Sequence, residues 1–186
     1  IVTHAHCSLE FRTLKSATQE KLHSSNTVRF KIEILNFLQQ EIMERIKIQL
    51  PETFVFSTLI KIRITDLNMG GHVGNDTFLS LLHEARHEFL KQLGYGEMQF
   101  EGYGLIMTDA AIEYKKELGQ GDEIKISVVA DGFDKYGFDL FYKMEVLTAT
   151  ENTLAAKAKT GMLCYDYASK KIVRLPEQAI EKLKAK

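Results

Sequence analysis

The 186-residue chain has only two cysteines, Cys7 and Cys164, which are too few for a disulfide framework. This scarcity suits a reducing compartment, so we predict a cytoplasmic location. No apolar run approaches the roughly 18–20 residues that cross a bilayer, and the N-terminus lacks the basic-then-apolar pattern of a secretory signal. The sequence therefore predicts a soluble protein without a membrane partner.

Neither sign of charge is in excess. Lysine and arginine total 24 against 25 aspartates and glutamates, for a formal net charge of -1. A chain balanced in this way lacks the broad positive field of non-specific nucleic-acid binders, so no nucleic-acid partner is expected. A hydrophobic content of 45% at this length supports one ordinary core, with at most an appendage.

Proline occurs only twice, and its first occurrence predicts a boundary. Before Pro51, apolar residues at helical spacing predict one amphipathic helix over about 28–48: Ile34, Leu35, Leu38, Ile42 and Ile46. Pro51 ends that helix because its ring clashes with the preceding turn and it has no N–H. We therefore divide the chain into an N-terminal helical extension, 1–50, and a main domain, 51–186.

A strand, a glycine-rich loop and a long helix follow. Ile60, Ile62 and Ile64 alternate with polar residues, which predicts a strand with one buried face. After the loop 65–76, Asn75 or Asp76 is expected to cap a helix that ends near Gly94 and Gly96. The apolar arc of this helix is wide, as expected when a curved sheet wraps around it: Phe78, Leu79, Leu81, Leu82, Ala85, Phe89, Leu90 and Leu93.

The rest of the chain is typical of an antiparallel meander. Strands are predicted near 103–116, 122–132, 136–149 and 153–165, with turn signals between them. Pro176 and Glu177 suit the first turn of a short closing helix. The predicted class is therefore α+β.

The loop before the long helix carries the chemistry of a site. It contains two adjacent glycines among polar side chains and directly precedes the unpaired N–H groups of a helix. Such a position can polarise a carbonyl or hold an anion.

The segment Asp66-Leu67-Asn68-Met69-Gly70-Gly71-His72-Val73-Gly74-Asn75 resembles the D-x-D-x-x-G-H-V-x-N signature of the 4-hydroxybenzoyl-CoA and acyl-acyl-carrier-protein thioesterase families, and Glu84-Ala85-Arg86 resembles their E-A-R step. Over about residues 52–175 the resemblance implies a hot-dog fold, a long helix wrapped by a five-stranded antiparallel sheet. It also implies homodimers or homotetramers with active sites at the dimer interface. The substrate would be an acyl-CoA or acyl carrier protein thioester, with no cofactor or metal.

This resemblance also bears on the first fifty residues, because the family core needs nothing before about residue 50. Met43 lies close to where such a domain normally begins. Residues 1–42 are therefore either a helical appendage or sequence upstream of the natural start.

The chain departs from the signature at Asn68, where the family has the acidic residue that serves as base or nucleophile. An amide has no titrating proton near neutral pH, so Asn68 can bind a water or a carbonyl oxygen but cannot be a general base. The remaining candidates are Asp66, His72, Asp76 and Glu84. Each also has a structural interpretation: a turn bond for Asp66, a helix cap for Asp76, loop bracing for His72 and an ion pair for Glu84.

Substrate binding is assigned to the start of the helix, where N–H groups around Val73 to Asn75 would stabilise a developing oxyanion. The residues assigned are Gly71, Val73, Gly74, Asn75 and Asp76.

Two other functions stay open at this point. The replacement of the acid by Asn68 is also what a non-catalytic acyl-thioester binding module would show. His83-Glu84-Ala85-Arg86-His87 matches the H-E-x-x-H motif of zinc hydrolases, which would need a distant third ligand such as Glu113 or Glu117.

Overall fold

The computed structural model describes residues 45–184. Residues from Ile46 onward form one compact unit. Its elements, in chain order, are β1 (Phe56–Lys61), the short 3-10 helix η1 (Ile64–Asp66), α3 (Asn75–Gln92), β2 (Gly104–Tyr114), β3 (Glu123–Asp131), β4 (Gly137–Val146), β5 (Thr153–Asp166), β6 (Lys171–Ile172) and α4 (Glu177–Lys184). The division of the chain at residue 50 stays a prediction, because most of the extension lies outside the described residues.

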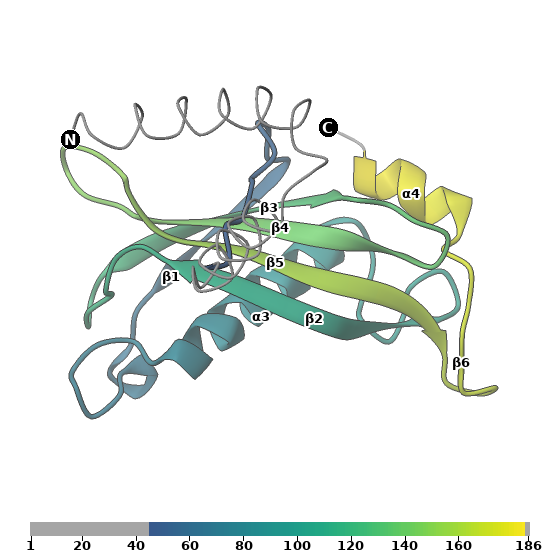
Figure 1. Cartoon of the computed structure of the whole chain (residues 1–186), viewed down its shortest axis with the longest axis horizontal. Helices are drawn as coiled ribbons and strands as arrows, with labels where there is room; N and C mark the ends of the chain where they lie inside the picture. The colour runs from purple at the N-terminus through teal and green to yellow at the C-terminus, as the bar shows by residue number, and fades with distance from the viewer. Residues whose placement is uncertain (1–44, 185–186) are drawn as a thin grey trace, which may run out of the picture. The chain divides into compact units, whose positions relative to one another are not determined.

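One antiparallel sheet forms the body of this unit, with the strand order β1-β3-β4-β5-β2, and β6 adds a two-residue pairing to β5 (Figure 1). Side chains alternate between the two faces of each strand. In β4 the inner residues Phe138, Leu140, Tyr142, Met144 and Val146 are buried. The sheet therefore has one face committed to the core.

Helix α3 lies along the inner face of the sheet (Figure 1). Its buried residues recur at helical spacing: Phe78, Leu81, Leu82, Ala85, Arg86, Phe89 and Leu90. Gly94, with φ of 77°, ends the helix in the left-handed conformation that glycine adopts without strain. A long helix enclosed by an antiparallel sheet of five long strands confirms the predicted fold class.

The first strand begins earlier than predicted. β1 spans Phe56–Lys61, and the chain then turns into η1, so Ile64 is 63% exposed and not part of the core. Ile62 is buried as expected, and its N–H and C=O bond the chain at Asp122 and Gly121. The alternating pattern correctly predicted inward positions for Ile60 and Ile62. It failed for Ile64, which lies beyond the end of the strand.

The predicted meander holds for β3, β4 and β5 but not for β2. β2 pairs with β5 at the far edge of the sheet, and the connection 115–122 returns the chain to β3. Leu118 in this connection is buried, and its carbonyl accepts the N–H of Val73 at 2.9 Å. Through this hydrogen bond the connection 115–122 holds the end of the glycine-rich loop in place.

Two local predictions at helix ends were wrong. Residues 45–50 are not helical, although the predicted amphipathic helix extended to about 48; Ile48 is buried and its N–H donates to Glu113 at 3.1 Å. The N-cap of α3 is Gly74, and no side chain caps it, so Asp76 lies inside the first turn.

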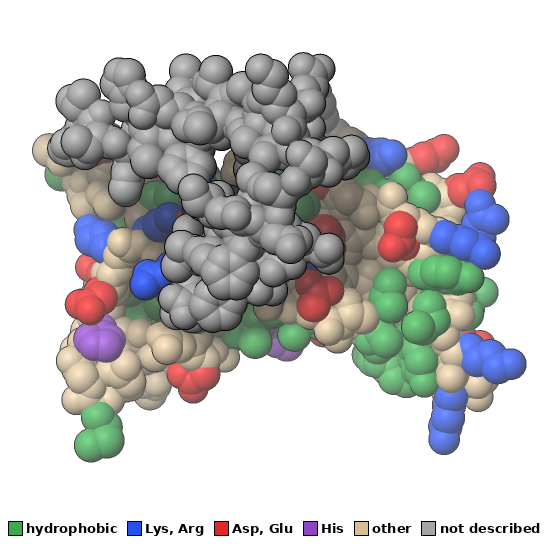
Figure 2. Space-filling view, viewed as in Figure 1, with side chains coloured by type: hydrophobic (Ala, Val, Ile, Leu, Met, Phe, Trp, Pro, Cys, Tyr) green, Lys and Arg blue, Asp and Glu red, His purple; other side chains and the backbone are tan. Residues whose placement is uncertain are grey.

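The closing helix α4 forms as predicted and buries Ala179 and Leu183. Among residues 45–184, no helix has both the length and the apolarity to cross a membrane. On the part of the described surface that Figure 2 shows, acidic and basic side chains are interspersed, in keeping with the balanced charge.

Candidate active site

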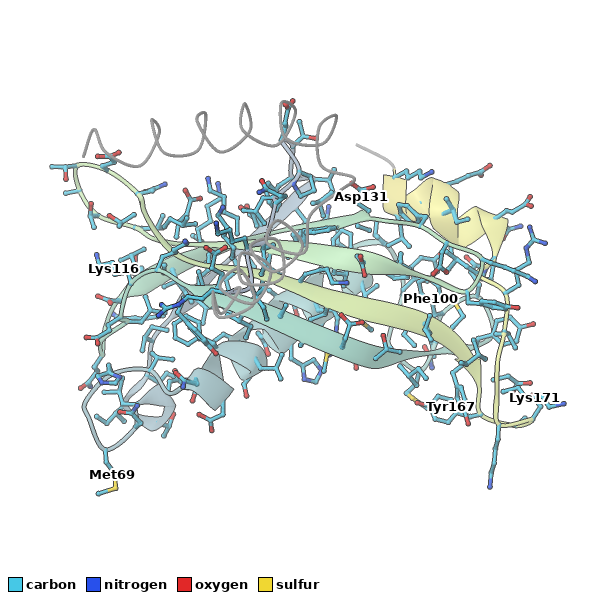
Figure 3. The ribbon with its side chains drawn as sticks, viewed as in Figure 1. Met69, Phe100, Lys116, Asp131, Tyr167 and Lys171 are labelled. Carbon is cyan, nitrogen blue, oxygen red and sulfur yellow. The ribbon has the colours of Figure 1, made fainter. Side chains whose placement is uncertain are left out.

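The signature loop is a narrow hairpin between η1 and α3. Leu67 and Val73 form an antiparallel bridge, and the N–H of Asn68 donates to the carbonyl of His72 at 2.9 Å. Gly71 closes the turn with φ of 82°, a conformation that favours glycine. Met69 lies at the tip with its side chain directed away from the domain (Figure 3).

Asn68 is bonded at both ends of its side chain. Its Oδ1 accepts the N–H of Gly70 at 2.8 Å, so its amide nitrogen faces His72, where Nδ2 lies 3.3 Å from Nδ1. An amide nitrogen can only donate, so Nδ1 of His72 accepts. Neutral His72 therefore carries its proton on Nε2 and presents a hydrogen-bond donor.

Gly70 provides the space that this arrangement needs. A Cβ at this position would lie 2.9 Å from Nε2 of His72 and 3.1 Å from Oδ1 of Asn68. The imidazole thus lies over a bare backbone, and any larger residue at position 70 would displace it.

Asp66 stabilises the start of the loop through hydrogen bonds from Arg63. Its buried carboxylate accepts the backbone N–H of Arg63 at 2.7 Å and the guanidinium Nη2 at 3.1 Å. The hydrogen bonds from Arg63 hold the pKa of Asp66 below its ordinary value. A carboxylate stabilised in its charged form and engaged on both oxygens is a weak base, so this geometry favours the turn role weighed for Asp66.

The start of α3 presents open backbone donors, with one correction to the sequence-based expectation. The N–H of Val73 is engaged by Leu118 and is not available. The first residues of α3 have no intrahelical partner for their N–H groups, and no side chain caps the helix. The donors are therefore those of the first turn, at Asn75 and Asp76, next to Gly74.

A tyrosine adjoins this turn. The hydroxyl of Tyr114, at the end of β2, donates to the carbonyl of Asn75 at 3.2 Å, and its ring packs edge-on against Phe78 at 5.0 Å. Sequence reasoning named Asn75 as a binding residue but did not connect Tyr114 to it, because the contact joins residues 39 positions apart.

Two carboxylates on α3, those of Asp76 and Glu84, remain candidates for the catalytic base. Asp76 lies in the first turn with Oδ1 over Gly74, where a Cβ would lie 2.6 Å from it, and Glu84 lies exposed on the same helix. Among residues 45–184, neither makes an ion pair. Eight residues separate them, about 12 Å along a helix, so the two cannot act on one carbonyl from a single subunit.

The H-E-x-x-H match has a simpler structural role. His83 and His87 are both exposed, and Nε2 of His83 lies 3.3 Å from Oε1 of Glu97. Glu113, offered as a third ligand, bonds Lys115 and the N–H of Ile48 instead. Within the described part of the chain, no three potential ligands come together to hold a metal.

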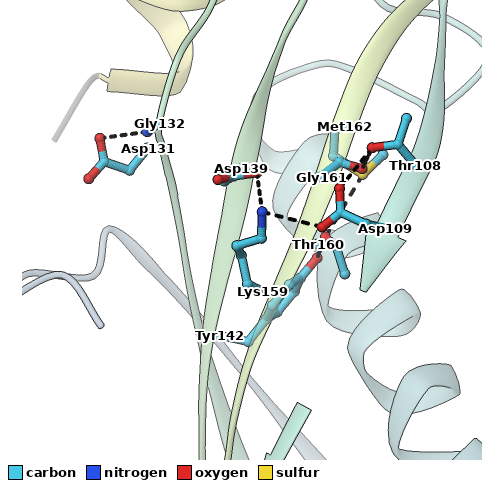
Figure 4. Close-up of polar contacts among 10 residues, drawn as sticks. All are labelled: Thr108, Asp109, Asp131, Gly132, Asp139, Tyr142, Lys159, Thr160, Gly161 and Met162. Carbon is cyan, nitrogen blue, oxygen red and sulfur yellow. Dashed lines mark hydrogen bonds and ion pairs between the residues drawn. The ribbon is translucent and has the colours of Figure 1, made fainter. Parts of the chain in front are cut away.

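A buried polar cluster lies further along α3. The Nε of Arg86 donates to Oε1 of Glu97 at 2.7 Å, and its Nη1 lies 3.7 Å from the sulfur of Met107. Nearby, the hydroxyls of Tyr142 and Thr160 are 3.0 Å apart (Figure 4). Burial raises the pKa of Tyr142, which the Thr160 bond and the Arg86 charge partly oppose.

The opposite face of the sheet carries its own ion-pair network. Lys159 on β5 bonds Asp139 on β4 at 2.9 Å and Asp109 on β2 at 3.3 Å (Figure 4). Gly161 leaves room beside β2 for the Asp109 side chain. A Cβ at position 161 would lie 2.2 Å from Oδ2 of Asp109. The network ties the edge strand β2 into the sheet at its bulge after Met107.

Comparison with known proteins agrees with this architecture. A family model described as the thioesterase-like superfamily matches residues 62–183. A 1,4-dihydroxy-2-naphthoyl-CoA hydrolase from Microcystis aeruginosa is 30% identical over 119 residues, which cover 62% of this chain and 83% of that protein.

Solved structures give the same fold. A 1,4-dihydroxy-2-naphthoyl-CoA thioesterase from Synechocystis is 21% identical with a TM-score of 0.61, covering 69% of this chain and 94% of its own. A hypothetical protein from Aquifex aeolicus is 25% identical with a TM-score of 0.61, and the match covers 70% of this chain and 100% of that protein. The chain thus has the hot-dog fold and belongs to the thioesterase-like superfamily.

Proposed function

We propose that this protein hydrolyses an acyl thioester of coenzyme A, or of acyl carrier protein, to a carboxylic acid and a free thiol. Family membership supports a thioester hydrolase in general, and the Microcystis relative is named for a CoA thioester. The observation that carries the proposal is the uncapped start of α3, whose open N–H groups adjoin the His72 hairpin.

The first turn of α3 would bind the thioester oxygen. Backbone N–H groups at a helix start favour negative charge, and they favour it most when the carbonyl oxygen becomes an oxyanion. His72 adds a second donor, because Asn68 holds its proton on Nε2. The hairpin would therefore polarise the thioester, and a different group would activate the attacking water.

A carboxylate of α3 would activate that water. Asp66 is engaged by Arg63, and Asn68 cannot accept a proton, which leaves Asp76 and Glu84 among the acidic candidates. Asp76 lies in the same turn as the donors, so it would act within one subunit. Glu84 lies two turns further on and would serve a carbonyl held elsewhere along the helix, such as one bound at a partner's site.

We further propose that two copies pair through β2. This strand is 11 residues long, stands at an edge of the sheet and has a pairing partner on one side only among the described strands. A long edge strand of this kind is a template for another strand. Light scattering of the purified protein should give twice the mass of one chain, or a higher even multiple.

The test is thiol release from short, medium, long and aromatic acyl-CoA substrates by the wild type and by single variants. His72→Ala should lower kcat by roughly 10²-fold, the usual cost of one oxyanion donor. Asp76→Asn and Glu84→Gln separate the two carboxylates, since the variant of the true base loses turnover. His87→Gln, on the exposed side of α3, is the matched control and should leave activity unchanged.

The alternative is a non-catalytic acyl-thioester binding module. The observation that favours it is Asn68, an amide in place of an acid, with both ends of its side chain hydrogen-bonded within the loop. Binding of acyl-CoA without thiol release, on every substrate and with acyl carrier protein thioesters as well, would establish the module and remove the hydrolase. A folded protein that neither binds nor cleaves would remove both.

A further inference from the structure

The sheet face turned away from α3 changes character along its length. Its middle carries charged side chains that pair with one another. Lys159 bonds Asp139 and Asp109 there, and Lys143 lies 2.7 Å from Glu145. The end of the face where β5 passes into β6 is apolar instead. Figure 2 shows hydrophobic side chains gathered at this end, with basic side chains at their margin.

Five side chains form the apolar end, which we call the corner patch: Ile106, Leu163, Tyr165, Tyr167 and Ile172. Ile106 on β2 stands opposite Leu163 on β5, and Tyr165 stands opposite Ile172 on β6. Directly opposite residues point to the same face of a sheet, and the residue between Leu163 and Tyr165, Cys164, is buried in the core. The patch therefore lies on the outer face.

A glycine makes room for Tyr167 on the patch. A Cβ at Gly104, which pairs with Tyr165, would lie 2.4 Å from the Tyr167 ring. The rings of Tyr165 and Tyr167 meet edge-on, with their centres 5.0 Å apart. Tyr167 and Ile172 are each 49% exposed. The patch is thus an ordered apolar surface that is open to solvent.

The turn between β5 and β6 presents two lysines beside this surface. Asp166 fixes the turn, because its carboxylate accepts the N–H of Ala168 at 2.9 Å and the hydroxyl of Ser169 at 2.6 Å. Lys170 and Lys171 are exposed, and neither makes an ion pair with another described residue. The paired lysines of the middle of the face differ from these two in that respect.

A third cation of the segment, Arg174, contributes less. It lines a shallow cleft together with Glu101 and Glu177, whose charges offset its own. Lys170 and Lys171 are therefore the cations on which a partner of opposite charge would depend.

The size and composition of the corner patch favour a lipid surface over a protein partner. Five side chains are far fewer than the roughly 20–30 residues per side in a stable protein interface. A bilayer sets no such minimum, and tyrosine and lysine suit its interface because each has an apolar body and a polar end. The sequence argument against a membrane partner rested on the absence of a spanning segment, which surface contact does not need.

We propose that the corner patch docks the protein reversibly on anionic lipid membranes. Tyr167 and Ile172 would lie at the level of the headgroups, with Lys170 and Lys171 over the lipid phosphates. A cation close to an anionic bilayer strengthens binding about fivefold, so the two lysines together contribute about 25-fold. The apolar side chains add a contribution that salt does not screen. This docking is independent of the proposed hydrolysis.

The first test is sedimentation of the full chain with two kinds of vesicle, one of phosphatidylglycerol and phosphatidylcholine in equal parts and one of phosphatidylcholine alone. The protein should sediment with the anionic vesicles only. Binding should fall at least about tenfold in 1 M NaCl, which screens charges beyond about 3 Å. A wild type that stays in solution with both kinds of vesicle would overturn the proposal.

Paired lysine variants test where the vesicles bind. Lys170→Gln with Lys171→Gln should weaken binding to the anionic vesicles about 25-fold. Lys115→Gln with Lys116→Gln is the matched control, because these two lysines are also adjacent and exposed but lie beyond the other end of β2. The control should bind as the wild type does. An equal loss in both double variants would mean that the attraction is general and that the corner patch does not direct it.

A single tryptophan tests contact with the lipid itself. The chain contains no tryptophan, so Tyr167→Trp supplies its only indole fluorescence. Anionic vesicles should shift this emission to shorter wavelength, and brominated lipids should quench it. Leu59→Trp, at a 66% exposed position on β1, is the control and should show neither effect. If Tyr167→Trp does not fold by circular dichroism, Ile172→Trp takes its place. Sedimentation without quenching at position 167 or 172 would contradict docking through the patch.

Light scattering separates lipid docking from contact between copies of the chain. Ile172→Ser should weaken binding to the anionic vesicles several-fold and leave the mass in solution unchanged, while Leu59→Ser should change neither. A lower mass for Ile172→Ser than for the wild type would make the corner patch an interface between copies and would exclude it as the lipid surface.

Discussion

Replacing Asp66 with asparagine should separate its structural role from a catalytic one. Only 6% of the Asp66 side chain is exposed, and Oδ2 accepts the backbone N–H of Arg63 at 2.7 Å. Asp66→Asn keeps the shape of the side chain and removes its charge. If Asp66 braces the loop, the variant should lose stability, and any loss of activity should follow from the displaced loop.

The magnitude follows from the bonds that are weakened. A hydrogen bond to a charged group contributes about 1.5–3 kcal/mol. The Arg63 side chain is 72% exposed, so solvent screens its ion pair with Asp66 and the backbone bond accounts for most of the effect. We expect the free energy of unfolding at pH 7 to fall by about 2 kcal/mol, which lowers Tm by about 4–8 °C for a domain of this size.

The stabilisation by Asp66 depends on pH. The bonds from Arg63 lower the pKa of folded Asp66, so the stabilisation is complete above the unfolded value of about 3.9 and is lost as the pH falls through the lower folded value. The stability difference between wild type and Asp66→Asn should therefore be constant above about pH 5 and shrink below about pH 4.

Urea denaturation at pH 7, 5 and 3.5 measures this difference. Asp131→Asn is the control, because Asp131 is exposed and bonds only its neighbouring Gly132 N–H at 2.8 Å (Figure 4); its variant should change stability by less than about 0.5 kcal/mol. Equal stability of wild type and Asp66→Asn at pH 7, together with lost turnover, would refute the bracing role and make Asp66 catalytic.

Three further results are expected. Gly137→Ala should cost about 2–4 kcal/mol by urea denaturation, because its Cβ would lie 1.9 Å from the Met162 carbonyl, whereas Gly119→Ala meets nothing nearer than 3.9 Å and should cost under about 1 kcal/mol. Burial raises the pKa of the Cys164 thiol to about 11, so peptide mapping after iodoacetamide at pH 8 should find it alkylated only in the unfolded chain. Leu118→Ala should cost about 2–4 kcal/mol and slow thiol release, because Leu118 fills the core behind the hairpin.

Local patterns in the sequence were sufficient for most of the elements. Strand-like runs between turn signals identified β3, β4 and β5, and the wide apolar arc of α3 indicated a helix enclosed by a sheet. These features depend on which residues are buried, and burial leaves a regular trace along the chain. The glycines at the end of α3 gave its boundary for the same local reason.

Features that depend on distant pairing were not predictable in this way. Nothing local says that β2 lies beside β5, or that Leu118 takes the N–H of Val73. Arg86 was read only as part of the E-A-R step, because a charged residue on a helix is usually solvated and its partner Glu97 follows the helix end. Each missed feature joins segments whose proximity only the fold creates.

Asn68 shows how a residue found by sequence can still have its role set by geometry. In the wild type its amide nitrogen donates to Nδ1 of His72, which leaves the His72 proton on Nε2. Asn68→Asp would place a carboxylate oxygen there instead. Nδ1 would then have to donate, and Nε2 would become an acceptor able to take a proton from water.

The residue at position 68 therefore determines whether His72 is a donor or a base. Nitrogen-15 NMR of labelled protein should show the Nε2–H form of His72 in the wild type and the Nδ1–H form in Asn68→Asp. If turnover in the variant no longer depends on the carboxylates of α3, His72 has taken over the activation of water. The same tautomer in both proteins would show that Asn68 does not control the imidazole.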